Sequence, residues 1–160
     1  VVLVIAVLSF LLFNFAEIIG PKRQVFLGDA GSTALGLVLV FFLIKTSEVE
    51  TATLKVSAAP WLIGLPLMDM VAVLIFRLQK RMSPLKADRL HIHHLLLEVG
   101  CSKFQVLGLL IFLQLIFVFV GIAGTIWTWN DGVLLWGCLV ILASYLIAAS
   151  KMRSSIAKAI

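Results

Sequence analysis

The sequence predicts an all-α protein, a polytopic membrane helix bundle of about five transmembrane helices. Of its 160 residues, 62% are hydrophobic, and the mean hydropathy is +1.14. Soluble domains are only about 45–50% apolar. Backbone N–H and C=O groups inside a bilayer must be satisfied within their own segment, so apolar stretches of this length are expected to be helices. Composition therefore excludes an ordinary soluble domain.

The apolar residues gather in five segments, which we expect to be the membrane helices. A helix needs about 20 residues to cross the hydrocarbon core, and all but the second segment come close to that length. No linker or change of composition divides the chain, so residues 1–160 are expected to form one transmembrane region. The segments run approximately over residues 1–19, 33–44, 56–76, 104–127 and 133–149.

Basic residues lie in alternate loops, and this predicts the orientation. Lysine and arginine are enriched in loops 20–32 and 77–103 and after residue 149. The loop at 45–55 carries balancing acids, and the loop at 128–132 carries only an aspartate. The positive-inside rule then places the three basic segments, including the C-terminus, in the cytoplasm. We expect a multi-pass protein of the cell inner (cytoplasmic) membrane.

The sequence opens on Val1 inside an apolar run without a positively charged flank, which does not resemble a signal peptide. We therefore expect it to be a piece of a longer protein. Cys101 and Cys138 lie in different environments and outside any metal-binding spacing, so both are expected to be free.

Asp29 lies in a short, turn-prone segment between the first two apolar stretches. Gly28 and Gly31 flank it and would let the backbone approach a ligand closely. Ser32 and Thr33 are expected to cap the second helix, whose N-terminus would face a phosphate. A carboxylate there suits a magnesium–diphosphate complex. The alternative is a plain turn that contains an aspartate.

A second polar cluster comes roughly sixty residues later. It contains His91, His93 and His94, preceded by Asp88 and Arg89. The spacing matches no standard zinc pattern. Imidazole and guanidinium groups donate hydrogen bonds to phosphate oxygens, so an anion site is the preferred interpretation. A solvated basic loop near lipid headgroups is the alternative.

Two polar residues fall inside apolar segments. Asp69 lies about two turns before the cytoplasmic end of the third segment, in which Pro60 and Pro66 are expected to cause a kink. An acid within the membrane is a functional candidate, but pairing with a nearby base or capping of a broken helix explains it equally well. Asn14 lies near the cytoplasmic end of the first segment.

The ordered motifs of this chain resemble those of the polyprenyl-phosphate N-acetylhexosamine-1-phosphate transferase family. The likeness is greater to members that carry N-acetylglucosamine than to those that load a muramyl-pentapeptide, because Ile92 interrupts the histidine run. The motifs are Val25-Phe26-Leu27-Gly28-Asp29-Ala30-Gly31-Ser32, Pro66-Leu67-Met68-Asp69, Met82-Ser83-Pro84 and Asp88-Arg89-Leu90-His91-Ile92-His93-His94-Leu95.

The resemblance implies an enzyme that transfers a sugar 1-phosphate from a UDP-amino sugar to undecaprenyl phosphate at the cytoplasmic face. UMP leaves, Mg²⁺ is required, and the lipid-linked sugar initiates a cell-surface glycan such as lipopolysaccharide. Asp29 resembles the family's catalytic, metal-binding aspartate. The three histidines resemble its catalytic phosphate-binding loop. Asn14, Arg89 and Asp69 are implied to bind substrate.

The family also carries an adjacent aspartate pair and an Asn/Asp-rich loop, and neither is present here. The chain therefore resembles the C-terminal portion of such an enzyme, and we expect it to need the upstream half and to be inactive alone. Membrane lipid is an expected partner and nucleic acid is not. A non-catalytic membrane subunit or transporter fragment that binds lipid headgroups is the alternative.

Overall fold

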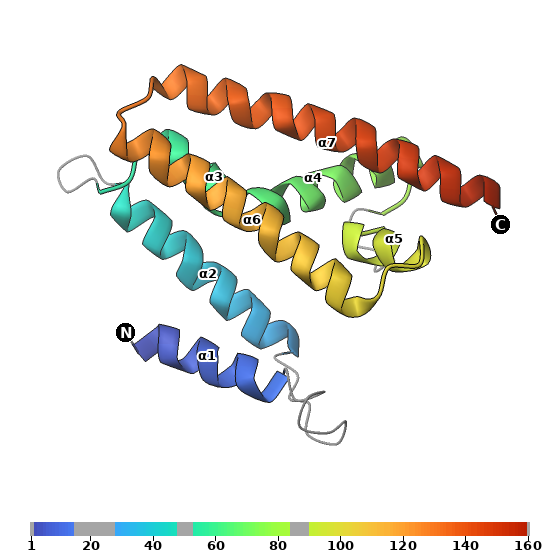
Figure 1. Ribbon diagram of the computed structural model, residues 1–160, viewed down its shortest axis with the longest axis horizontal. Helices are drawn as coiled ribbons and strands as arrows, with labels where there is room; N and C mark the ends of the chain where they lie inside the picture. Colours follow the sequence, from blue (N-terminus) through green and yellow to red (C-terminus); the bar gives the residue numbers. More distant parts are fainter. Residues whose placement is uncertain (1, 15–27, 48–52, 84–89, 160) are drawn as a thin grey trace. The chain divides into compact units, whose positions relative to one another are not determined.

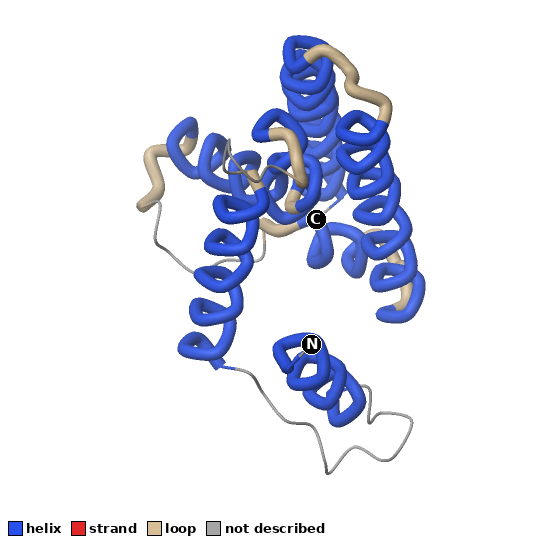
Figure 2. Tube along the Cα trace, turned by 90° about the vertical axis from the view of Figure 1, so that its left-hand side faces the viewer, coloured by secondary structure: helices blue, strands red, loops and turns tan. Residues whose placement is uncertain are grey.

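The computed structural model describes residues 2–14, 28–47, 53–83 and 90–159, with backbone only at 2–3, 12–14, 29 and 154–159. Every regular element in these ranges is helical, and Figure 2 shows no strand among them. The expected all-α class is confirmed. The elements are α1 (Val2–Asn14), α2 (Gly28–Thr46), the 3-10 helix η2 (Val56–Ala58), α3 (Ala59–Leu62), α4 (Gly64–Gln79), α5 (Ile92–Glu98), α6 (Lys103–Ile126) and α7 (Asp131–Ala159) (Figure 1).

The chain divides into two compact units, Val1–Lys45 and Thr46–Ile160. The first unit contains α1 and nearly all of α2. Both helices are apolar and expose large side chains, such as Leu37 at 72% of its surface. Such surfaces are costly in water and are stabilised by lipid.

By length and composition, the described helices include two that can cross a membrane, Lys103–Ile126 and Asp131–Arg153. A third span results if the bent pair Val56–Leu62 and Gly64–Gln79 crosses as one. Ala30–Thr46 is a shorter apolar helix. Each of the five expected segments is thus mainly helical where described, and two or three of them meet the length of a full span.

The expected kink in the third segment is present, but it lies between the two prolines. The helices on either side of Ile63 differ in direction by 77°. Pro60 lies in the first turn of α3 and Pro66 in the first turn of α4. A proline is tolerated in the first turn because its missing N–H would have no partner within the helix. Each proline therefore lies near the start of one of the two helices, and the chain bends between them at Ile63.

Glycines bring the second unit's helices close together. A Cβ at Gly64 would lie 2.5 Å from the ring of Phe117, and one at Gly121 would lie 2.8 Å from the Cβ of Trp61. The Trp61 indole N–H donates to the carbonyl of Leu134 at 3.1 Å. Residues without a side chain thus let α3, α4, α6 and α7 pack around Trp61, which is only 4% exposed.

Contacts at one end of the second unit agree with the predicted alternation of loops. The amine of Lys55 lies 3.9 Å from Asp131, and the hydroxyl of Ser57 donates to the same carboxylate. At the other end, Arg153 of α7 binds the carbonyl of Leu90. The segments before η2 and before α7 therefore share one end, while the histidine segment and the last part of α7 share the other.

Candidate functional site

Asp69 of α4 is the centre of a polar cluster formed by α4, α5 and α7. Its Oδ2 lies 2.9 Å from Nδ1 of His91. Its Oδ1 accepts hydrogen bonds from the backbone N–H of Ile92 at 3.0 Å and from the hydroxyl of Tyr145 at 2.8 Å. Only 9% of the residue is exposed. Burial of a carboxylate is costly unless it is hydrogen-bonded, and here both oxygens are engaged.

The sequence of α4 directs Asp69 inward. The buried residues of this helix recur at intervals of three and four, which is the spacing of one helical face. Asp69 is the polar member of that face, and the contacts of α4 with α6 and α7 cover it. The buried residues are Gly64, Leu65, Met68, Asp69, Ala72 and Val73.

The carboxylate of Asp69 also caps the N-terminus of α5. His91 precedes this helix with an extended backbone, φ −66° and ψ 148°, and its own side chain makes no capping bond. The first N–H groups of a helix have no partner within the helix. Asp69 accepts the N–H of Ile92 from another helix and places a negative charge at the positive end of α5. The start of α5 is therefore determined by a tertiary contact.

The three imidazole rings lie next to one another. The ring centroids of His91 and His93 are 5.8 Å apart and nearly parallel at 15°, and those of His93 and His94 are 4.1 Å apart. Nδ1 of His91 faces Oδ2 of Asp69 and donates to this oxygen in the tautomer that carries its proton on Nδ1. The pKa of His93 is lowered by partial burial and then by His94 and His91, while Asp69 opposes the shift. His93 is therefore neutral at pH 7.

Two residues of α7 complete the cluster. Tyr145 donates to Asp69, and Arg153 donates from Nη2 to the carbonyl of Leu90 at 2.8 Å. The guanidinium carbon of Arg153 lies 4.9 Å from the ring centroid of Phe76, which is a cation–π distance. The residue is 8% exposed.

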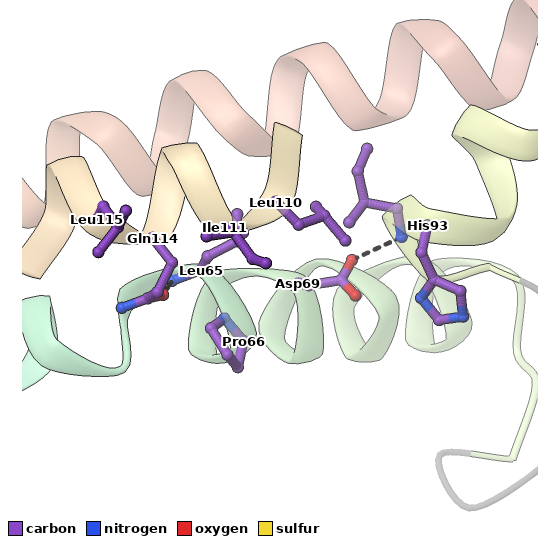
Figure 3. Close-up of a pocket in the computed structure, with 9 residues that line it drawn as sticks. Leu65, Pro66, Asp69, His93, Leu110, Ile111, Gln114 and Leu115 are labelled. Atoms are coloured by element: carbon purple, nitrogen blue, oxygen red, sulfur yellow. Dashed lines mark hydrogen bonds between the residues drawn. The ribbon is translucent and has the colours of Figure 1, made fainter. Parts of the chain in front are cut away.

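An open cavity of about 430 Å³ adjoins the cluster. In Figure 3, Gln114 and Leu115 lie toward one end of it and His93 lies toward the other. Its walls are mainly apolar, from α4, α5 and α6, so an apolar molecule would be accommodated beside the imidazole. The lining residues are Leu65, Pro66, Asp69, Ile92, His93, Leu110, Ile111, Gln114 and Leu115.

Gln114 spans the bend between α3 and α4. Its amide nitrogen donates to the carbonyl of Leu62 at 2.8 Å, and its oxygen accepts from the N–H of Leu65 at 3.1 Å. These are backbone groups at the interruption of the helix, where the regular hydrogen-bonding pattern is broken. One side chain of α6 therefore satisfies both sides of the bend.

The structure brings together four of the predicted site residues, namely Asp69, His91, His93 and His94. Asp29 and Asn14 belong to the first unit, and their side chains lie outside the described part. Arg89 also lies outside the described residues. Their roles remain predictions, as does substrate binding by Asp69, whose contacts here are with protein groups.

The expected turn around Asp29 is corrected. Helix α2 begins at Gly28, whose φ is +66°, and Asp29 is already its second residue. Ser32 does not cap the helix, because it lies one turn inside and its hydroxyl donates to the carbonyl of Gly28 at 3.1 Å. A positive φ is accessible to glycine without steric cost, which explains why the helix can begin there.

Tyr145 and Gln114 were not predicted from the sequence. Gln114 is an isolated polar residue in a long apolar run, which is itself a signal that the side chain has a specific partner, whereas Tyr145 follows Ser144 in another such run. Tyr145 is the only tyrosine in the chain.

The part of the chain with described side chains contains no group of three His, Cys, Asp or Glu residues suited to a metal ion. The oxygens of Asp69 are engaged by His91, Ile92 and Tyr145. These residues alone do not form a magnesium site.

The fold and the site define an integral membrane protein of helices, with a buried aspartate that holds a histidine cluster beside an apolar cavity. Comparison with known proteins finds that the sequence pattern of "Glycosyl transferase family 4" matches residues 1–47. No solved structure matches significantly.

Curated relatives include proteins named undecaprenyl-phosphate alpha-N-acetylglucosaminyl 1-phosphate transferase. The chain is 33% identical to the Haemophilus influenzae protein over 143 residues, which is 89% of this chain and 40% of that protein. It is 38% identical to the Salmonella typhi protein and 37% to the Escherichia coli K12 protein over 120 residues, 75% of this chain and 32% of each relative. The resemblance inferred from the motifs is confirmed, and the chain spans less than half the length of these relatives.

Proposed function

We propose that this chain is part of an enzyme that transfers N-acetylglucosamine 1-phosphate from a UDP-sugar to undecaprenyl phosphate. The relatives' names support the sugar phosphate and the lipid acceptor, since similarity to them extends over 89% of the chain. The coverage of 40% of the Haemophilus influenzae protein agrees with the expectation that an upstream half contributes to the site.

The observation that carries the proposal is the position of His93 at one end of a mainly apolar cavity. The acceptor has two parts of opposite character, a long hydrocarbon chain and a phosphate. An apolar wall suits the first part, and imidazole N–H groups suit the oxygens of the second. The apolar wall and the imidazole of His93 line the same cavity, so one site offers a partner to each part of the acceptor.

In the proposed reaction, an oxygen of the lipid phosphate attacks the phosphorus that carries the sugar. The new P–O bond forms as the bond between that phosphorus and the UMP oxygen breaks, so that UMP leaves with the electron pair. Several negative charges meet in this step. Neutral His93 and its neighbour His94 would donate hydrogen bonds to phosphate oxygens and hold them in position, which is how most phosphoryl-transfer catalysis is achieved.

Magnesium belongs to the proposal through Asp29, whose carboxylate is the ligand type that this ion prefers. When bound, the ion would neutralise diphosphate charge. The described residues alone supply no complete set of ligands for the ion. We also propose that the histidine end of the second unit faces the cytoplasm, because the neighbouring segments are the basic ones.

The test uses the full-length protein that contains this chain, in membranes with undecaprenyl phosphate, Mg²⁺ and radiolabelled UDP-N-acetylglucosamine. Label is expected in the lipid fraction, with release of one UMP per lipid labelled. Asp29→Asn is expected to abolish transfer, whereas Asp131→Asn, a matched change at the opposite end of the second unit from the histidines, is expected to retain it.

Two results would revise the proposal. Transfer only from another UDP-amino sugar would preserve the reaction class and change the donor. Absence of transfer with every donor, or equal activity in Asp29→Asn and wild type, would favour a non-catalytic membrane subunit that binds lipid headgroups.

A further inference from the structure

The segment from Leu90 to Ile92 carries the first histidine and leads into α5. Side chains from two other helices hold each of its three residues. Asp69 of α4 binds the ring of His91 and the N–H of Ile92, and Arg153 of α7 binds the carbonyl of Leu90. The segment is thus attached at three successive residues within the second unit.

Helix α7 acts on this segment both directly and through Asp69. Tyr145 and Arg153 are eight residues apart, which places them on the same side of the helix, about two turns apart. Tyr145 donates to Asp69 Oδ1 at 2.8 Å, the oxygen that also accepts the N–H of Ile92 at 3.0 Å. Loss of the tyrosine hydroxyl would remove one of the three hydrogen bonds that hold this carboxylate and leave those to His91 and Ile92.

Burial makes this arrangement restrictive. Asp69 is 9% and Arg153 is 8% exposed, so water offers few alternative partners. Buried polar groups favour the one geometry in which their hydrogen bonds are made. The Phe76 ring beneath the guanidinium of Arg153 further limits its orientation.

We propose that Tyr145 and Arg153 are positioning residues, which act with Asp69 to fix the histidine cluster in its working orientation. The ring of His91 lies beside that of His93, which in turn lies beside that of His94. A shift of His91 would therefore move the two rings that follow. This role rests on the proposed transferase function. Two residues of α7 that are distant in sequence from the histidines would thus influence the reaction at α5.

The test compares Tyr145→Phe with wild type in the full-length protein. Phenylalanine preserves the ring and removes only the hydroxyl. Ser144→Ala is the matched control, since it removes a neighbouring hydroxyl whose described bond is to Ile141 within the same helix. Amide hydrogen exchange is measured by mass spectrometry on peptides covering residues 90–98, and kcat and KM are measured on folded enzyme.

We expect exchange in residues 90–98 to become about three- to tenfold faster in Tyr145→Phe and kcat to fall by a similar factor. KM for the UDP-sugar should stay within about twofold. Arg153→Lys keeps the charge but loses the planar group and should also accelerate exchange. Ser144→Ala should match wild type in every measurement.

Wild-type exchange and kcat in Tyr145→Phe would overturn the positioning role, as would an equal effect of Ser144→Ala. Faster exchange in a full-length protein that transfers no sugar phosphate from any donor would instead overturn the proposed function and leave the attachment of the segment standing.

Discussion

Asp69 accepts a hydrogen bond from the backbone N–H of Ile92, 23 residues away, at 3.0 Å. A side chain of α4 thereby caps the first residue of α5, the helix that carries His93 and His94. The same carboxylate binds His91 and Tyr145. The helix bundle and the candidate site thus share one buried group, and substitutions there should affect both.

Asp69→Asn tests this shared role. The amide keeps the shape and one acceptor oxygen, but it replaces the charged acceptor facing His91 with a donor or a neutral oxygen. Hydrogen bonds to charged groups contribute about 1.5–3 kcal/mol. We expect kcat of the full-length enzyme to fall about 10- to 100-fold, measured by label transfer at saturating donor. Unchanged kcat would show that the carboxylate is not needed at the site.

The lowered pKa of His93 predicts how stability depends on pH. In the unfolded chain the pKa is near 6.5, and in the folded protein burial, His94 and His91 hold it lower against the opposing charge of Asp69. The unfolded state then binds more protons, so stability decreases as the pH falls through 6.5. The melting temperature of wild type should decrease more between pH 7 and pH 5 than that of His93→Gln. Parallel curves would contradict the lowered pKa.

Gln114→Leu tests the bend between α3 and α4. The substitution leaves the carbonyl of Leu62 and the N–H of Leu65 without this partner, and each such group costs about 1–3 kcal/mol. We expect a melting temperature in detergent several degrees below wild type. Gln105→Leu, an exposed glutamine of the same helix, is the control and should cost less. A smaller decrease for Gln114→Leu than for Gln105→Leu would refute the role of the amide.

Gly121→Ala tests the close packing around Trp61. The added methyl would lie 2.8 Å from the Cβ of Trp61 and 3.2 Å from the carbonyl of Ala58. Overpacking of this kind costs about 1–3 kcal/mol. Gly108→Ala, in the same helix with nothing within 4 Å, should be neutral or stabilising by up to about 1 kcal/mol. Equal melting temperatures for the two variants would contradict the packing described.

Much of the fold could be predicted from composition, because long apolar runs in a bilayer have few alternatives to helices. The bend was predicted in the correct segment, but its position was not. Pro60 and Pro66 are visible in the sequence, whereas the hydrogen bonds of Gln114 to Leu62 and Leu65 depend on the packing of α6. The start of α2 was placed too late, since Ser32 is a good capping residue that here lies inside the helix.

The candidate site could be predicted only in part. The histidines, including His93, and the intramembrane acid Asp69 could each be recognised from the sequence as candidate site residues. The contact between Asp69 and the histidine cluster could not be predicted. His91 comes 22 positions after Asp69, and the contact depends on the path of the intervening chain. Tyr145 resembled an ordinary membrane residue until its partner was known.

The most direct test of the central claim is transfer by the full-length enzyme with His93→Ala and His94→Ala, each alone, beside an Asn130→Ala control at the other end of the second unit. If the histidine cluster holds phosphate oxygens, label from UDP-N-acetylglucosamine in the lipid fraction should fall at least about 100-fold, or the KM for donor should rise, while the control stays active. Wild-type kinetics in both histidine variants would contradict the account.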